Sequence, residues 1–173
     1  ANGNNNAAIG YEAGRYLTGS NNIAMGQSAG SGDLGQLLTV NDTISLGHGS
    51  NVSGNQSVAI GSGPVLVDGS RGGALALATG AVAIGSNASG GAWATAENAI
   101  ALGGESIAAG LNSVAVGRGS QANGEQSIAI GDGNIVNAAR SGAIGDPSII
   151  DADDSYSVGN NNSIGSGANN SFV

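Results

Sequence analysis

The sequence predicts an all-β fold, a parallel β-roll or solenoid built from fourteen-residue coils. Three observations lead to this prediction: a five-residue phrase recurs along the whole chain, its apolar residues alternate with a period of two, and a glycine closes every repeat. A short, fixed period is typical of stacked coils that contact only their neighbours. The period of two is typical of β-strands, and no segment shows the 3.6-residue stripe of an amphipathic helix.

The recurring phrase reads small, apolar, Ala or Ser, apolar, Gly, and it occurs ten times in the 173 residues. From Gly103 onward a closing glycine stands at every fourteenth position, whereas the earlier intervals between closing glycines are 16, 21, 14, 24 and 18. We interpret the long intervals as the same coil carrying insertions. The closing glycines, called anchor glycines below, are Gly10, Gly26, Gly47, Gly61, Gly85, Gly103, Gly117, Gly131, Gly145 and Gly159.

The first strand of each coil is expected just before the anchor glycine. Alternate residues of a strand point to opposite sides, so the residues one and three before the glycine share one face and the residue between them faces the other way. That middle residue is Ala or Ser in all ten repeats, which indicates a narrow roll interior. The predicted interior residues are Ala59, Ala83, Ala101, Ala115, Ala129 and Ala143.

A second, smaller strand is expected after each anchor glycine, most clearly in residues 103–110 and 117–124. Each coil then consists of two short strands and two glycine turns. A strand of four or five residues is only about 15 Å long, so the coil is a flattened loop with room only for small side chains. Ser106, Ala108, Ser120 and Ala122 fit this interior.

The large apolar residues of the first strands should point out of the roll and form a continuous apolar ladder. Such a ladder exceeds the few hundred Å² of contiguous apolar surface that soluble monomers usually carry. The simplest cover is the same ladder on identical chains around a rotation axis, which predicts an obligate oligomer. The predicted interface residues are Ile23, Met25, Ile44, Leu46, Val58, Ile60, Val82, Ile84, Ile100, Leu102, Val114, Val116, Ile128, Ile130, Ile144 and Val158.

Residues 57–61 (SVAIG), 112–120 (NSVAVGRGS) and 127–131 (SIAIG) carry a family resemblance. They resemble the NSVAIGxxS repeats of the YadA-like head domain of trimeric autotransporter adhesins. The resemblance covers nearly the whole chain as one head domain, residues 1–173. It implies a left-handed parallel β-roll, a homotrimer, display on a stalk above a Gram-negative outer membrane, and a role in attachment and virulence.

The composition agrees with a solenoid, because 33 glycines and only five aromatic residues do not make an ordinary globular core. A formal net charge of −8, tripled in a trimer, disfavours nucleic acid and anionic membrane as partners. We find no signal peptide, transmembrane span or lipidation motif. The secretion signal, neck, stalk and membrane anchor of the family are therefore expected outside this fragment, which itself should make no direct membrane contact.

Three segments interrupt the regular coils: residues 27–42, residues 62–80, and residues 86–98, which contain the only tryptophan. Each allows two interpretations. It is either a tolerated loop on the rim of a coil or a specificity loop, since insertions in repeat proteins cluster on binding faces. The apolar stretches 36–40 and 64–67 favour strand-like packing against a neighbouring coil or subunit.

No set of residues predicts catalysis, a metal or a cofactor, and the ligand-binding residues are left unassigned. His48 is the only histidine, and we interpret it as a solvated turn residue. Asp151, Asp153 and Asp154 are interpreted as a solvated acidic loop and not as a calcium site, because hard cations need six to eight converging oxygens.

Two function classes remain. The leading one is an adhesive head that binds host extracellular matrix, cell-surface receptors or sister bacteria, with its affinity multiplied by three-fold avidity. The alternative is a structural spacer that projects another binding domain from the cell surface.

Overall fold

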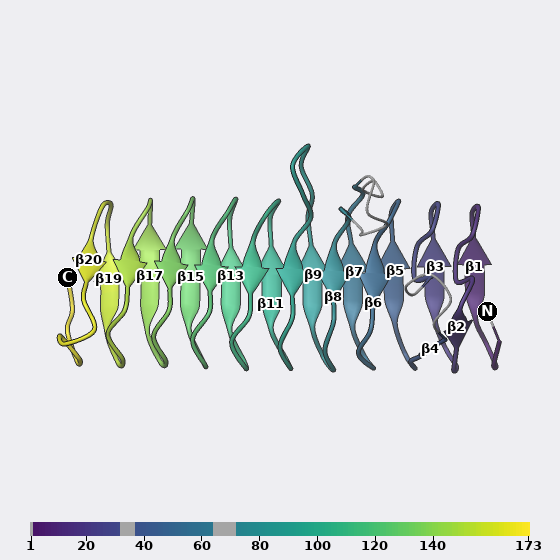
Figure 1. The fold of residues 1–173 in the computed structure, drawn as a ribbon, viewed down its shortest axis with the longest axis horizontal. Coiled ribbons are helices and arrows are strands. Elements are labelled where there is room, and N and C mark those ends of the chain that lie inside the picture. Colours follow the sequence, from purple (N-terminus) through teal and green to yellow (C-terminus); the bar gives the residue numbers. More distant parts are fainter. Residues whose placement is uncertain (1, 32–36, 64–71) are drawn as a thin grey trace.

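The computed structural model describes residues 2–31, 37–63 and 72–173, and it confirms the all-β parallel solenoid. Figure 1 shows the coils stacked side by side along one axis, with the N-terminal coil at one end and the C-terminal coil at the other. Within the described ranges there is no α-helix, and thus none long and apolar enough to cross a membrane.

Two long parallel sheets make up the roll, and each coil contributes one strand to the first sheet. In spatial order the ten strands of the first sheet are β1 (Ala7–Ile9), β3 (Ile23–Met25), β5 (Ile44–Leu46), β7 (Val58–Ile60), β9 (Val82–Ile84), β11 (Ile100–Leu102), β13 (Val114–Val116), β15 (Ile128–Gly131), β17 (Gly142–Gly145) and β19 (Tyr156–Val158).

The second sheet has eight strands, also in chain order. They are β6 (Asn51–Val52), β8 (Leu75–Ala76), β10 (Trp93–Ala94), β12 (Ile107–Ala108), β14 (Gln121–Ala122), β16 (Ile135–Val136), β18 (Ile149–Ile150) and β20 (Ser163–Ile164). Near the N-terminus, β2 (Leu17–Thr18) and β4 (Leu38–Thr39) form a separate parallel pair.

The register follows the sequence repeat. Ile100 of β11 pairs with Val114 of β13, the residue at the same place in the next repeat. The longer intervals keep the same phase, since Val58 of β7 pairs with Val82 of β9. The long intervals are therefore coils that carry insertions, as we interpreted them from the sequence.

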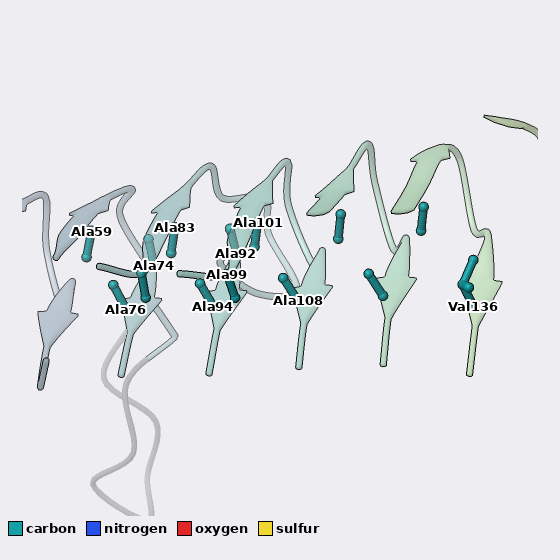
Figure 2. Packing of buried hydrophobic residues seen from close by; sticks show 14 of the residues in the cluster. Ala59, Ala74, Ala76, Ala83, Ala92, Ala94, Ala99, Ala101, Ala108 and Val136 are labelled. Carbon is teal, nitrogen blue, oxygen red and sulfur yellow. The ribbon is translucent and has the colours of Figure 1, made fainter. Parts of the chain in front are cut away.

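Small side chains fill the centre of the roll. The residue between the two apolar positions of the first strand has no exposed surface in Ala59, Ala83, Ala101, Ala115, Ala129 and Ala143. Ala108 and Ala122 of the second sheet are fully buried as well. Figure 2 shows alanines of the two sheets, such as Ala101 and Ala108, pointing into the space between them.

The interior also holds larger side chains, so the expectation that only small ones fit is wrong. The larger buried residues are Leu17, Val40, Val52, Val136, Ile150 and Ile164, each at most 3% exposed. Val136 and Ile150 follow Ala122 in the inward row of the second sheet, which begins at Val52. In the same coils the first sheet contributes only alanine, Ala129 and Ala143, which leaves room for one branched side chain opposite.

The anchor glycines allow successive coils to approach closely. Gly117 has a φ of +116°, which L residues rarely adopt, and a Cβ there would lie 1.8 Å from the carbonyl oxygen of Gly131. Gly131 stands in the same relation to Gly145, with 1.7 Å between a built Cβ and the carbonyl oxygen. Each anchor glycine therefore packs backbone against backbone on the next one.

Replacing Ala115 with leucine is expected to destabilise the roll far more than replacing Gln121 with leucine. Ala115 has no exposed surface, whereas Gln121 lies half-buried on the second sheet of the same coil. Overpacking a closed interior costs at least about 1–3 kcal/mol. Thermal melting of both variants checks this, and equal losses of melting temperature would contradict the assignment of inside and outside.

Candidate interaction surfaces

The apolar ladder lies on the outer face of the first sheet, where it forms two rows. In neighbouring coils Ile100 lies beside Val114, and Leu102 lies beside Val116. The side chains are half-exposed to exposed: Met25 is 42% exposed and Ile144 47%. Within a single chain the ladder is thus open to solvent along the ten-stranded sheet.

The structure brings all of the predicted interface residues onto this one sheet, and none of them is buried within the chain. Each lies one residue from a fully buried Ala or Ser of the interior. This separation follows from the strand period of two. It leaves a large apolar surface that the chain itself does not cover.

Gly142 interrupts the ladder in the sequence but not in space. It pairs with Tyr156 of the next coil, and a Cβ built on Gly142 would lie 2.8 Å from the Tyr156 ring. The ring therefore occupies the space that an apolar side chain at residue 142 would take. Tyr156 is 40% exposed and continues the ladder towards the C-terminal coil.

A second apolar row, which we call the outer row, was missed by sequence reasoning. It lies on the outer face of the second sheet and consists of Leu75, Trp93, Ile107, Ile135 and Ile149, with Gln121 between Ile107 and Ile135. Trp93 is 42% exposed and Ile149 44%. The sequence signal for this row is an apolar residue four positions after the anchor glycine. It is hard to recognise because Gln121 and Ser163 are polar at that position, and because insertions increase the distance from the glycine to Leu75 and Trp93.

The insertion within residues 86–98 forms a compact hairpin. Ser86 makes an antiparallel bridge with Gly91, and the amide nitrogen of Asn87 donates to the Gly90 carbonyl at 2.9 Å. The Asn87 Oδ1 accepts from the amide nitrogens of Ser89 and Gly90 at 2.8 and 2.9 Å. Figure 1 shows this loop rising beyond the rim of the neighbouring coils near β9.

The two other insertions are described in part. The prediction of strand-like packing for residues 36–40 is confirmed at Leu38 and Thr39, because β4 pairs with β2. Val40 is buried at 1% exposure. The apolar stretch 64–67 and residues 32–36 lie outside the described residues.

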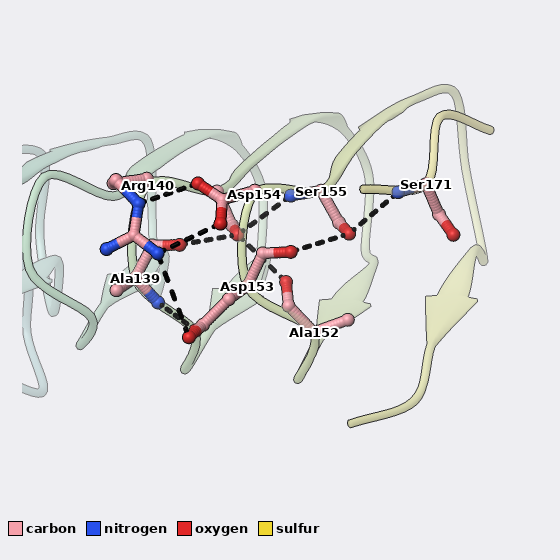
Figure 3. A network of polar contacts seen from close by, with 8 residues as sticks. Ala139, Arg140, Ala152, Asp153, Asp154, Ser155 and Ser171 are labelled. Carbon is pink, nitrogen blue, oxygen red and sulfur yellow. Dashed lines mark hydrogen bonds and ion pairs between the residues drawn. The ribbon is translucent and has the colours of Figure 1, made fainter. Parts of the chain in front are cut away.

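Charged residues of the turns bind the next coil. The Arg140 Nε donates to the Asp154 Oδ1 at 2.6 Å, and its Nη2 donates to the Asp154 Oδ2 at 2.9 Å. Asp153 accepts from the Ala139 amide at 2.9 Å and lies 3.9 Å from Arg140. Figure 3 shows this network crossing from one coil to the next. A similar ion pair joins Arg118 to Asp132 at 2.8 Å.

The acidic segment 151–154 is therefore fastened to the preceding coil and is not simply solvated. Asp151, too, accepts a hydrogen bond at 2.7 Å from the Asn137 side chain. In the part of the chain that the structure describes, no three His, Cys, Asp or Glu side chains are grouped so that they could hold a metal ion.

The hydrogen bond from Arg140 holds the pKa of Asp154 below its usual range. A carboxyl group whose pKa falls on folding stabilises the folded state above its unfolded pKa, and this stabilisation disappears as the pH falls through the folded pKa. Because both side chains are largely exposed to solvent, the contribution is small. It acts only in the acid range.

Replacing Asp154 with asparagine should therefore flatten the acid limb of the stability profile slightly. Asparagine also tolerates the φ of +56° at this position. The measurement is the melting temperature between about pH 6 and pH 3, around the ordinary carboxyl pKa. Asp146→Asn, in another exposed turn, serves as the control; an unchanged acid limb in Asp154→Asn would contradict the coupling.

His48 lies in the predicted turn, and its amide nitrogen donates to the Ser62 Oγ at 3.2 Å. The ring is half-buried, and its Nε2 is buried without a hydrogen-bond partner among the described residues. The expectation of a solvated ring is wrong for this atom. An imidazole without a carboxylate or hydroxyl partner forms no base and nucleophile pair.

Comparison with known families gives one result. The family model of the YadA head domain repeat matches the chain in two copies, over residues 41–63, 90–106 and 108–134. The matched residues include strands of both sheets, among them β11, β13 and β15 of the apolar ladder. No curated protein matches the chain.

Proposed function

We propose that this chain, in which YadA head domain repeats are detected, is the adhesive head of a trimeric autotransporter that attaches a Gram-negative cell to host extracellular matrix or host cell surfaces. The YadA head family is adhesin-type, and it is located at the Gram-negative outer-membrane surface. Its members form trimers and bind host matrix in general. We also propose that residues 1–173 form a single head domain, that the roll is left-handed, and that other parts of the protein anchor it to the membrane. Binding between sister bacteria is a further part of the proposed function.

The open apolar ladder is the observation that supports this function most strongly. Burying a Val, Leu, Ile or Met side chain fully contributes about 1.5–3 kcal/mol. The ladder residues are already half-covered by their neighbours, so their burial against other subunits would contribute on the order of ten kcal/mol per chain before ordering entropy is subtracted. We propose that the ladder residues listed above form the trimer interface.

The second sheet and the turns would then face outward. Every subunit presents the same row of side chains coil after coil, and three subunits multiply each contact. Such repetition supports binding through many weak contacts, because linked sites raise the overall affinity without any new contact.

Binding of the purified assembly to immobilised collagen, fibronectin and laminin, and to epithelial cells, tests the adhesive function. An adhesin should bind at least one of these surfaces saturably and should lose avidity when the trimer is broken. An intact trimer that binds none of them would contradict adhesion and would favour the structural spacer.

Adhesion is expected to decline gradually as outward polar residues are replaced. Replacing Arg118 and Gln121 in one coil should weaken binding modestly, whereas equivalent changes in several coils should compound, because the contacts are nearly equivalent. His48→Ala should leave binding unchanged. Attachment strength under flow is the measurement, and complete loss from a change in one coil that leaves the assembly intact would contradict distributed binding.

A further inference from the structure

We propose that the cavity between the 86–91 hairpin and the next coil binds a cationic side chain, arginine or lysine, of a polypeptide partner. The cavity measures about 200 Å³ and is lined by Ser89, Gly90, Gly91, Trp93, Glu105 and Ile107. It is smaller than the pockets of about 300–1,000 Å³ that enclose drug-sized ligands. Its size suits one long side chain. As a contact with a host protein, the proposal rests on the proposed adhesive function.

The hairpin and the outer row build the cavity together. Trp93 opens β10 and lies beside Ile107 of the next coil. The Glu105 amide donates to the Gly91 carbonyl at 3.1 Å, which fastens the end of the hairpin to the following coil. With the Asn87 contacts inside the hairpin, this bond holds the walls in place before a ligand arrives. Such preorganisation reduces the entropy lost on binding.

Trp93 supplies an aromatic surface for a cation. It is the only tryptophan of the chain and remains 42% exposed at the cavity. Indole is the aromatic group that attracts ammonium and guanidinium groups most strongly. The (CH₂)n stem of a lysine or arginine would also fit against Ile107, because these side chains bury their stems along apolar surface.

Glu105 supplies the opposite charge. Its side chain is half-buried, and within the described part of the chain no hydrogen bond or ion pair engages its carboxylate. The neighbouring cation Arg118 is paired with Asp132 instead. A half-buried carboxylate that lacks a partner favours a cationic ligand.

The backbone of Glu105 is left-handed, with a φ of +62°. The equivalent turn residues are Glu12 and Ser28 in the first two coils, at +57° and +56°, and Gly119 and Gly133 in the two coils that follow Glu105, at +65° and +68°. A non-glycine residue in this conformation carries a cost that glycine avoids. Because glycine also serves at this position, Glu105→Gly removes the carboxylate without adding backbone strain.

A cation suits this cavity better than a sugar does. A sugar ring carries several hydroxyl groups, and each loses free energy when it is buried unpaired. Here one carboxylate is the only charged group in a lining that otherwise consists of small, apolar and aromatic residues. The net charge of −8 also attracts basic partners.

The cavity stays accessible in the proposed assembly. Trp93 and Ile107 belong to the second sheet, whereas the apolar ladder belongs to the first. A trimer would therefore present three copies of the cavity, which strengthens weak single contacts on a surface that carries many ligands.

Trp93 fluorescence provides a local test, because no other tryptophan contributes. The probe is a blocked glycyl-arginyl-glycine peptide, added in solution and also immobilised densely for capture of the assembly. Its neutral counterpart contains citrulline, which has nearly the same shape. We expect a saturable change in fluorescence with the arginine peptide, and binding weaker by about tenfold with the citrulline peptide.

Two glutamate variants separate local contact from overall charge. Glu105→Gln and the matched control Glu97→Gln remove the same charge, but Glu97 is exposed at the opposite turn of the roll. Capture on the arginine surface should fall at least about fivefold for Glu105→Gln and stay unchanged for Glu97→Gln. Glu105→Gly should also lose capture while melting no lower than the parent, because glycine relieves the positive φ.

Several results would overturn the assignment. These are equal binding of the arginine and citrulline peptides, equal effects of the two glutamine variants, or a saturable fluorescence change with galactose or N-acetylglucosamine but none with arginine. The peptide assay needs no host molecule. A negative result in the peptide assay would therefore exclude the cation site without excluding adhesion. Adhesion to matrix is tested separately, by binding of the unmodified assembly to the immobilised matrix proteins.

Discussion

Replacing Val114 with aspartate is expected to convert the assembly into monomers. Val114 lies in the middle of the apolar ladder, half-buried within its own chain. In an assembly around a rotation axis, each introduced carboxylate would lie near its symmetry mates in an apolar interface. Desolvation and like-charge repulsion would act together. Ile130→Asp should have the same effect from the other row of the ladder.

Sedimentation velocity measures this directly. The matched control is Gln121→Asp, which adds the same charge to the second sheet of the same coil. The control should sediment like the parent, whereas Val114→Asp should sediment as a single chain. If Val114→Asp sedimented as an assembly as stable as the parent, the ladder would have to face some other surface.

Replacing Gly117 with alanine is expected to prevent the central coils from stacking. The φ of +116° and the distance of 1.8 Å from a built Cβ to the Gly131 carbonyl oxygen leave no place for a methyl group. The obstacle is backbone, which cannot swing away as a flexible side chain would. The two coils must separate, which breaks the pairing of β13 with β15.

Gly119 provides a control in the same turn. Its φ of +65° is left-handed, but a Cβ there would meet nothing within 4 Å. Gly119→Ala should cost only about 1–2 kcal/mol, and Gly119→Asn should cost less. Urea unfolding followed by circular dichroism compares the variants, and a Gly117→Ala protein as stable as Gly119→Ala would contradict the stacking of the anchor glycines.

The repeat alone was sufficient to predict the fold. The alternation of residues before each anchor glycine predicted the position of every strand of the first sheet. Only one assignment of inward and outward positions buries Ala101, Ala115 and Ala129 and exposes their apolar neighbours. Register then followed from the repeat, since parallel coils pair position for position. Even coils with insertions kept their phase, because a loop can leave the sheet between two strands.

Other features depend on contacts that a repeat does not encode. Val136 and Ile150 are buried at the inward position where the neighbouring strands β12 and β14 carry alanine, so the repeat of the first strands does not set the size of the residue opposite. Gln126 and Arg140 adopt positive φ of +56° and +54° at a turn position that holds asparagine in the two preceding coils. There, hydrogen bonds from coil to coil, such as that between Arg140 and Asp154, offset the cost of the conformation.

The candidate sites were predictable to different degrees. The apolar ladder is visible in the sequence because it repeats. The cavity at Trp93 depends on one insertion, residues 86–91, which lines it together with residues of the next coil and occurs once in the described part of the chain. Because the insertion is not repeated, the sequence repeat does not predict which residues lie beside it. Only the folded structure shows that Glu105 lies next to the hairpin.

The native mass of the purified chain is the most direct test of whether the apolar ladder is a subunit interface. Native mass spectrometry, with sedimentation equilibrium in the same buffer, distinguishes one chain of 16.4 kDa from an assembly of identical chains. We expect three times 16.4 kDa, with no monomer persisting on dilution. A stable, folded monomer of 16.4 kDa with its ladder open to solvent would contradict the claim that the ladder is a subunit interface.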